Sequence, residues 1–201
     1  MLDVLEQDRE FLRGLEPCLG LELGSGSGCA ITFLSHALRP HHLACLATDV
    51  NPRATHATLR TAERNLTSVD AILTSFSDGL LPSKRLFDVI LFNPPYVPTE
   101  CVNAVAQRPC RQSVSSCDPD GLLEVAWAGG KRGRYWIDRV LPKIDGLLSD
   151  KGVMYMIVLA ANDPEELREW AEKEWGFKSE MAMKRRTGLE ALQVLKFWRA
   201  L

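Results

Sequence analysis

Short apolar runs alternate with longer amphipathic stretches along most of the chain. The apolar runs have the length and composition of buried strands and cover residues 18–23, 42–49, 69–74, 87–93 and 151–159. Apolar residues recur at helical spacing within residues 4–16, 29–38, 51–65, 129–148 and 163–175. Pro52 and Pro164 stand where a helix should begin, which suits the first turn of a helix. The alternation predicts an α/β fold, with helices on both faces of a mostly parallel sheet.

The carboxyl-terminal part of the chain departs from this alternation. Two further strands are expected at about residues 178–184 and 190–198, around the basic turn sequence "MKRRTG". The connection is too short for a helical crossover, so the two strands should form a hairpin and one of them should run antiparallel. We expect a single α/β domain over residues 1–201, with a mostly parallel seven-stranded sheet and a C-terminal antiparallel hairpin. Residues 99–120 carry no period and are expected to form a loop.

Three polar stretches fall where parallel strands are expected to end. They are "GSGSG" (24–28), Asp49 and "NPPY" (93–96). Ligands of open parallel sheets bind at the carboxyl ends of the strands, so the coincidence predicts a functional site. Plain turns are the alternative, because glycine turns easily and proline cannot donate to a sheet ladder.

The residues near the first two strand ends discriminate between two nucleotide ligands. Glycine recurs at every second position of the first loop, at Gly24, Gly26 and Gly28. A dinucleotide fingerprint would place its third glycine where Cys29 stands. Glu22 would repel a pyrophosphate but suits a ligand with an ammonium or sulfonium group. Asp49 can accept hydrogen bonds from both hydroxyls of a ribose, and capping the next helix is its alternative role. Together these residues favour S-adenosylmethionine over NAD.

The stretch after the fourth strand suits a planar nitrogen acceptor. An amide nitrogen is a poor nucleophile because its lone pair is delocalised into the carbonyl, so an enzyme must orient it. Asn93 Oδ1 and the Pro94 carbonyl can each accept one N–H of a planar NH2 group, and the Tyr96 ring can pack against it. Methyl transfer is then mainly positioning and needs no covalent intermediate.

These motifs resemble those of class I methyltransferases that modify planar amide or exocyclic nitrogens. Among them, the chain is similar to the HemK/PrmC-type glutamine methyltransferases, most closely to the eukaryotic branch that acts on the class I translation termination factor. The resemblance covers nearly the whole chain and rests on "LELGSGSG", "ATDVNPRA", "FNPPYVPT", "EVAWAGGKRGRYWIDR" and "LQVLKF". "NPPY" alone is shared with adenine-N6 methyltransferases, whereas "AWAGG" is more specific to the eukaryotic branch.

The resemblance implies a Rossmann-like domain that transfers a methyl group from S-adenosylmethionine to the glutamine of a Gly-Gly-Gln loop in the release factor. The implied catalytic residues are Asn93, Pro94 and Tyr96. The implied cofactor-binding residues are Glu22, Gly24, Gly26, Gly28, Asp49, Val50, Ser75, Phe76 and Asn93. Ser75 and Phe76 stand where family members usually carry Asp-Leu beside the adenine. The acidic N-terminal segment that helps to close the donor site in the family is expected to be absent.

The resemblance also implies a partner protein. The strand at residues 69–74 should lie at a sheet edge, and an apolar edge with unpaired backbone groups invites association. In the eukaryotic family, a small zinc-binding activator covers this edge. A heterodimer through the edge between Val69 and Phe76 is therefore expected, with the zinc held by the activator. Cover by a loop or another segment of the chain is the alternative.

Composition and spacing limit the other functions. The net charge of −2 gives no positive excess for autonomous nucleic-acid binding. The longest apolar run, at residues 153–161, is too short for a membrane helix, which needs roughly 20 residues. The six cysteines form no CxxC pair and the four histidines no ligand-like spacing, so we expect reduced thiols and no metal site in this chain. A cytoplasmic protein is expected, with the nucleus as a second location.

Several interpretations stay open at this point. An adenine-N6 nucleic-acid methyltransferase would share "NPPY" but usually carries a target-recognition domain and a basic face. A protein lysine methyltransferase would differ in its acceptor. A non-catalytic subunit is a third alternative, against which the intact Glu22, Asp49 and "NPPY" argue. Trp127 is expected either in the core or at the substrate entrance, and "KRGR" (131–134) as a solvated helix start.

Overall fold

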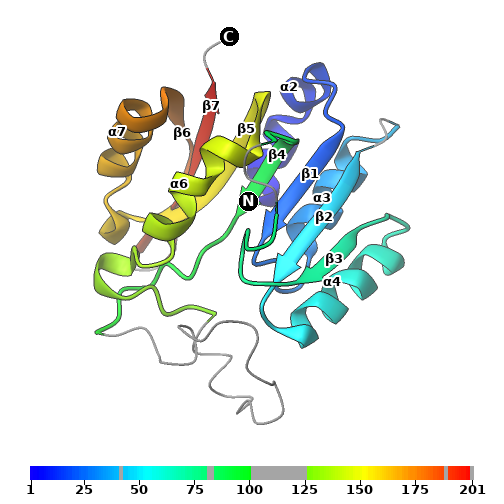
Figure 1. The fold of residues 1–201 in the computed structure, drawn as a ribbon, viewed down its shortest axis with the longest axis horizontal. Helices are drawn as coiled ribbons and strands as arrows, with labels where there is room; N and C mark the ends of the chain where they lie inside the picture. The colour runs from blue at the N-terminus through cyan, green and yellow to red at the C-terminus, as the bar shows by residue number, and fades with distance from the viewer. Residues whose placement is uncertain (41–42, 81–83, 101–125, 188–189, 200–201) are drawn as a thin grey trace.

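The computed structural model describes residues 1–40, 43–80, 84–100, 126–187 and 190–199. The loop expected at residues 99–120 lies mostly outside these ranges. Seven strands form one sheet in the order β3-β2-β1-β4-β5-β7-β6 (Figure 1). The strands are β1 (Leu19–Leu23), β2 (Ala44–Asp49), β3 (Asp70–Leu73), β4 (Phe87–Phe92), β5 (Leu148–Leu159), β6 (Phe177–Thr187) and β7 (Glu190–Arg199).

The pairing of the strands confirms the predicted fold class. β1 pairs in parallel with β2 and β4, β2 with β3, and β4 with β5. β7 runs antiparallel to both β5 and β6, as expected for the C-terminal hairpin. The prediction that "MKRRTG" is a turn is wrong for Met183 to Thr187, because β6 extends to Thr187. Pairing with β7 continues along this basic stretch and keeps it extended.

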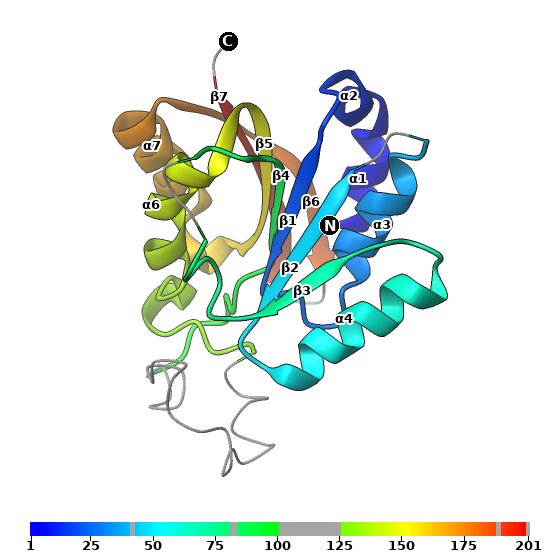
Figure 2. The ribbon, with the colours of Figure 1, turned by 45° about the vertical axis from the view of Figure 1, so that its right-hand side comes forward.

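Helices cover both faces of the sheet, which stands between them in Figure 2. The helices are α1 (Leu2–Gln7), α2 (Arg9–Gly14), α3 (Cys29–Ala37), α4 (Pro52–Arg64), α6 (Ile137–Leu147) and α7 (Pro164–Trp175), with the short 3-10 helices η3 (Lys131–Gly133) and η4 (Ala160–Asn162). α1 to α4 belong to one apolar cluster, and α6 and α7 to the other. None of the helices in the described ranges has both the length and the hydropathy needed to cross a membrane.

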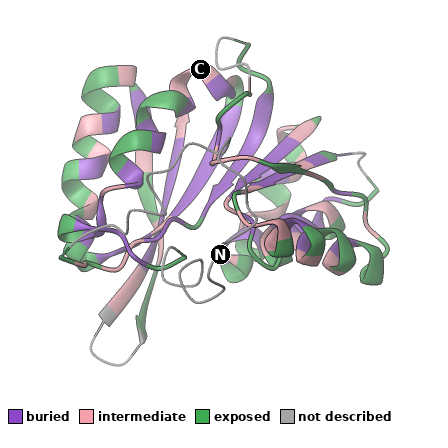
Figure 3. Cartoon of the chain, turned by 60° about the horizontal axis from the view of Figure 1, so that its bottom comes forward, coloured by how far each residue is buried: buried purple, intermediate pink, exposed green. Residues whose placement is uncertain are grey.

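The central strands are buried on both of their faces (Figure 3). Along β4, Val89 and Leu91 join the cluster of α1 to α4, whereas Ile90 and Phe92 join that of α6 and α7. All six residues of β4 are buried. Strands covered on both faces are apolar throughout, which is why the sequence shows continuous apolar runs in place of strict alternation.

The helix predicted over residues 4–16 is divided in the structure. α1 ends at Gln7 and α2 begins at Arg9, with Asp8 between them. The Asp8 carboxylate accepts hydrogen bonds from the Tyr155 hydroxyl (2.6 Å) and the Lys196 ammonium (2.7 Å). Lys196 is buried, and a buried charge needs a partner of opposite sign. The division therefore reflects contacts with β5 and β7 that the local pattern does not contain.

The predicted edge strand is confirmed. Within the described residues, β3 pairs with β2 alone and ends the sheet on that side. Ile72 and Leu73 on this strand are 42% and 46% exposed. The opposite edge, β6, differs in composition, because it carries the charged residues Lys178, Glu180, Lys184, Arg185 and Arg186. The β3 edge is thus the one that presents apolar side chains with little charge.

Candidate active site

The glycine loop joins β1 to α3 by a tight, left-handed path. Gly24, Gly26 and Gly28 have φ values of +69°, +54° and +72°, which side chains other than glycine's rarely adopt. The N–H groups of Gly24 and Ser25 donate to the carbonyl of Thr48 at the end of β2. A Cβ at Gly28 would lie 2.7 Å from the Thr58 backbone, so Gly28 lets α4 approach the loop closely. The loop is therefore fastened both to β2 and to α4.

Two carboxylates stand beside this loop. Glu22, on β1, is buried, and its Oε2 accepts a hydrogen bond from the Ile31 N–H (3.1 Å). Burial, reinforced by the charge of Asp49, raises the pKa of Glu22 to about 8, although the Ile31 bond acts in the opposite direction. Asp49, the last residue of β2, accepts from the N–H groups of Gly26 (2.9 Å) and Asn51 (2.8 Å).

The alternative role predicted for Asp49, capping the next helix, is filled by Asn51. Asn51 is the N-cap of α4, and its side chain accepts from the Arg53 N–H at 2.9 Å. Asp49 instead connects the glycine loop to the start of α4. Each of its oxygens keeps a second lone pair, so it can still accept from a ligand hydroxyl.

The strand ends and the loop enclose a cavity of about 520 Å³. This volume lies in the range of small-molecule binding sites. The cavity brings together most of the residues predicted to bind the cofactor: Glu22, Gly24, Gly26, Asp49, Val50, Ser75, Phe76 and Asn93. Gly28 faces Thr58 rather than the cavity, and Pro94 and Tyr96 lie outside the lining, where Pro95 contributes instead.

An aromatic wall separates the cavity from the core. Phe76 lines the cavity with a φ of +47°, and its ring packs against Phe92 (centroids 5.5 Å apart) and Trp136 (5.2 Å). Trp136 and Ile157 also line the cavity and were not predicted. Ile157 lies near the carboxyl end of β5, so the rule that ligands sit at strand ends could have found it. Nothing local to Trp136 indicates its position, because it comes from the start of α6.

The "NPPY" turn is held by the segment that follows residue 125. Val97 forms a bridge with Ala128, and its N–H donates to the Trp127 carbonyl at 3.1 Å. The N–H of Gly129 donates back to the Val97 carbonyl at 2.8 Å. Asn93 is exposed at the cavity, directly after β4. The "NPPY" turn, which follows β4 directly, is thus also attached through Val97 to residues 127–129.

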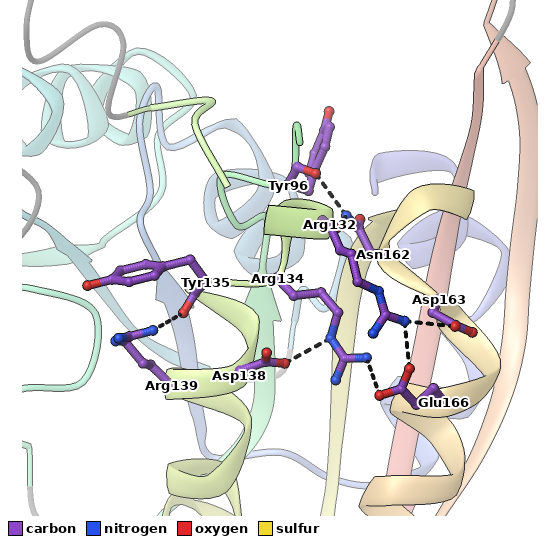
Figure 4. Close-up of polar contacts among 9 residues, drawn as sticks. All are labelled: Tyr96, Arg132, Arg134, Tyr135, Asp138, Arg139, Asn162, Asp163 and Glu166. Carbon is purple, nitrogen blue, oxygen red and sulfur yellow. Dashed lines mark hydrogen bonds and ion pairs between the residues drawn. The ribbon is translucent and has the colours of Figure 1, made fainter. Parts of the chain in front are cut away.

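Two interpretations of this segment are corrected. Trp127 is 46% exposed, so its interpretation as a core residue is wrong. "KRGR" is solvated at Lys131 and Arg132, but Arg134 is buried. The Arg134 guanidinium pairs with Asp138 (2.9 Å) and Glu166 (3.0 Å), which draws it between α6 and α7 (Figure 4).

The sheet order and the ligand-sized cavity at the glycine loop and acidic strand ends define a class I methyltransferase. More narrowly, the chain belongs to the family of the methyltransferase small domain, whose model matches residues 11–156. It is 38% identical to the methyltransferase HEMK2 of Homo sapiens, covering 98% of this chain and 84% of that protein. It is 33% identical to the eRF1 methyltransferase catalytic subunit mtq2 of Schizosaccharomyces pombe, covering 99% and 85%. The resemblance to the eukaryotic HemK branch is therefore confirmed.

Solved structures agree with this fold. The Mtq2-Trm112 complex of E. cuniculi, responsible for methylation of the eRF1 translation termination factor, aligns with a TM-score of 0.64 at 24% identity, covering 99% of this chain and 92% of that one. The 16S rRNA N2 G1207 methyltransferase of T. thermophilus, solved with AdoMet and guanosine, aligns with a TM-score of 0.59 at 17% identity, covering 98% and 42%. At these identities the likeness shows the fold alone.

Proposed function

We propose that this methyltransferase uses S-adenosylmethionine to methylate the side-chain amide of the glutamine in the Gly-Gly-Gln loop of the eukaryotic class I release factor. The observation that carries the proposal is one cavity that joins the buried Glu22 and the half-buried Asp49 to Asn93. The similarity to the mtq2 subunit, whose name specifies eRF1, supports the acceptor.

The donor end of the cavity fits S-adenosylmethionine chemically. Burial makes the free carboxylate of Glu22 costly, as its raised pKa shows, and a cationic ligand would favour the ionised form. Asp49 has lone pairs available for ribose hydroxyls. Ser75 and Phe76 line the same cavity, where they can contact an adenine. When bound, the cofactor supplies a methyl group made electrophilic by the positive charge on its sulfur.

The acceptor end supplies orientation. Asn93 Oδ1 and the Pro94 carbonyl accept the two N–H groups of the glutamine amide and so direct its nitrogen toward the donor end. The two prolines restrict the backbone between these acceptors, because the pyrrolidine ring fixes φ. Their contribution to rate is the placement of the acceptor nitrogen, for which small displacements are costly.

The exposed β3 edge supports a heterodimer as part of the proposal. Ile72 and Leu73 present apolar side chains on a strand that, in the described part of the chain, pairs with β2 alone, and such an edge is the type of surface that another chain covers. A small zinc-binding activator is the proposed occupant, with the zinc held by the activator. The complex named for the E. cuniculi structure, Mtq2-Trm112, supports this assignment.

The test is a direct comparison of acceptors. The chain, co-expressed with the activator, is incubated with labelled S-adenosylmethionine and separately with the release factor, a histone and duplex DNA. Label on the release factor is expected, and mass spectrometry should locate it on the Gly-Gly-Gln glutamine. Label on DNA would support adenine-N6 methylation, label on a histone lysine would support lysine methylation, and either result without release-factor labelling would overturn the proposal.

A further inference from the structure

The backbone carbonyl of Tyr96 accepts a hydrogen bond from Asn162, a buried residue that does not line the cavity. We infer that Asn162 is a positioning residue for the acceptor site, which it holds in place through the backbone of "NPPY". The inference deepens the proposed function and rests on it, since it concerns the same acceptor turn.

Both the nitrogen and the oxygen of the Asn162 side-chain amide form hydrogen bonds. Asn162 is completely buried in η4, directly after β5. Its Nδ2 donates to the carbonyls of Tyr96 (Figure 4) and Arg132, both at 2.8 Å. Its Oδ1 accepts from the Leu159 N–H at 2.6 Å. The two carbonyls belong to segments that lie 66 and 30 residues away in the sequence. One side chain therefore ties together the acceptor turn, η3 and the end of β5.

The backbone around this amide is packed too closely to shift without breaking contacts. A Cβ at Gly133 would overlap both the Tyr96 carbonyl and the Asn162 side chain. A Cβ at Gly129 would lie 2.6 Å from the Pro95 carbonyl. The two glycines let the segment lie directly against the turn, which is a physical reason for the glycines in "AGGKRG". Asn162 then connects the two backbones by donating to a carbonyl in each.

Ion pairs fasten η3 to α7 on the outer side of this contact. Arg132 pairs with Asp163 (2.8 Å) and Glu166 (2.6 Å), and the buried Arg134 also reaches Glu166 (Figure 4). Exposed pairs such as those of Arg132 contribute little energy on their own. The buried amide of Asn162 is the stronger constraint, because losing it would remove a hydrogen bond from each of two backbone carbonyls.

This arrangement predicts an effect on turnover rather than on donor binding. The turn is supported by the end of β4 before Asn93 and, after the prolines, by the Asn162 bond to Tyr96 and the backbone bonds of Val97. The Asn162 bond is the one nearest to the prolines, so releasing it changes the direction of the Pro94 carbonyl. Displacement of a reacting group by about 1 Å can cost about a hundredfold in rate. Asn162 does not line the donor cavity, so its substitution should leave the affinity for the donor unchanged.

The test compares Asn162→Asp and Asn162→Ala with a matched control, Ser149→Ala. The control removes a side-chain hydrogen bond to the buried Asp88 (2.6 Å) at the opposite end of β5. We expect both Asn162 variants to lower kcat on the release factor by about 10- to 100-fold, with calorimetric S-adenosylmethionine affinity within about twofold of wild type. Ser149→Ala should lower Tm but keep kcat within about twofold.

Hydrogen exchange provides a readout that is independent of activity. The N–H groups of Val97 and Thr99 bond to the carbonyls of Trp127 and Gly130, so they report directly on the anchorage of the turn. Exchange at both should accelerate in Asn162→Ala but not in Ser149→Ala. If Asn162→Asp does not fold by circular dichroism, Asn162→Ala decides.

Three results separate the inference from the proposed function. Unchanged kcat and unchanged exchange in a folded Asn162 variant would overturn the inference. A parallel fall in kcat and donor affinity would also overturn it, since that is the signature of general structural loss. Failure of the wild-type complex to methylate the release factor would instead refute the proposed function, and exchange at Val97 would still decide whether Asn162 anchors the turn.

Discussion

The two ends of the cavity are built in different ways. The donor end is formed by β1, the loop at residues 24–28 and the end of β2, each of which carries its functional group where a strand stops. The acceptor end joins the turn at residues 93–96 to residues 126–136 and to Asn162, which come from three separate parts of the chain. The donor end carries two carboxylates, whereas neutral carbonyl and amide groups form the acceptor turn. In the proposed function, charge would thus select the donor, and geometry would orient the acceptor.

The largest effect should come from Asn93→Ala, which separates the two ends. Loss of one of two acceptors for the amide should lower kcat by about a thousandfold, because the nitrogen is no longer oriented. Donor affinity measured by calorimetry should stay within about threefold. Asn65→Ala is the matched control, since the Asn65 side chain donates to the Thr61 carbonyl of its own helix (2.8 Å) and does not line the cavity. Near-normal turnover of the Asn93 variant would refute the role given to the acceptor turn.

Asp49→Ala should produce the next largest effect, at the donor end. It removes the acceptors proposed for the ribose and also the bonds to Gly26 and Asn51. Hydrogen bonds to charged groups contribute roughly 1.5–3 kcal/mol each, so S-adenosylmethionine affinity should fall about tenfold or more. Asp150→Ala, at an exposed carboxylate away from the cavity, should bind normally. Unchanged affinity of Asp49→Ala would contradict the donor assignment, and NAD should not stabilise the wild type in a thermal-shift assay.

A change of pH should sharpen the comparison, because among the described carboxylates a strongly raised pKa is found only at Glu22, in the donor end. The pKa of Glu22 in the free protein is about 8, and a cationic donor favours the ionised form, so binding should release about one proton at neutral pH. Donor affinity should rise about tenfold between pH 6 and pH 7 and level off above pH 8. Calorimetry in buffers with different ionisation heats counts the proton.

The same group changes the stability of the free protein in the opposite direction. The folded state keeps a proton on Glu22 that the unfolded chain releases near the ordinary pKa of a glutamate, 4.5. Its contribution to the free energy of unfolding should therefore decrease as pH rises from about 4.5 to about 8. Glu22→Gln should remove both dependences. If wild type and this variant show the same pH profile of binding, the assignment of Glu22 to the cationic donor is wrong.

The smallest effect on the cavity should come from Ile72→Lys on the β3 edge. The substitution adds a charge to an exposed residue of the proposed partner surface, so activity gained by co-expression should be lost. Donor affinity of the folded chain should stay within about twofold. Met181→Lys is the matched control, because Met181 is similarly exposed (40%) on the opposite edge strand. Equal co-purification of both variants with the activator would argue against an interface at β3.

The predictions from sequence succeeded where local chemistry and strand ends coincide. Glu22, Asp49 and Asn93 were placed correctly in one cavity because each lies at or next to the carboxyl end of a strand, and parallel strand ends meet at one edge. Gly28 was assigned to the ligand, yet its lack of a side chain serves contact with α4. Trp136 was missed, because its position at the cavity depends on how the start of α6 packs against the sheet.

By itself, the sequence determined the order of elements, the parallel sheet with its hairpin and the chemistry of the donor end. These follow from hydrophobic periodicity and from residues that act within a few positions of a strand end. Only the tertiary structure decided the break at Asp8, the burial of Arg134 and the bond from Asn162 to Tyr96. Each of these is a polar contact between distant segments, whose partner is defined by the packing of the whole sheet. Such contacts have no local period in the sequence, so they become visible only when the chain has folded.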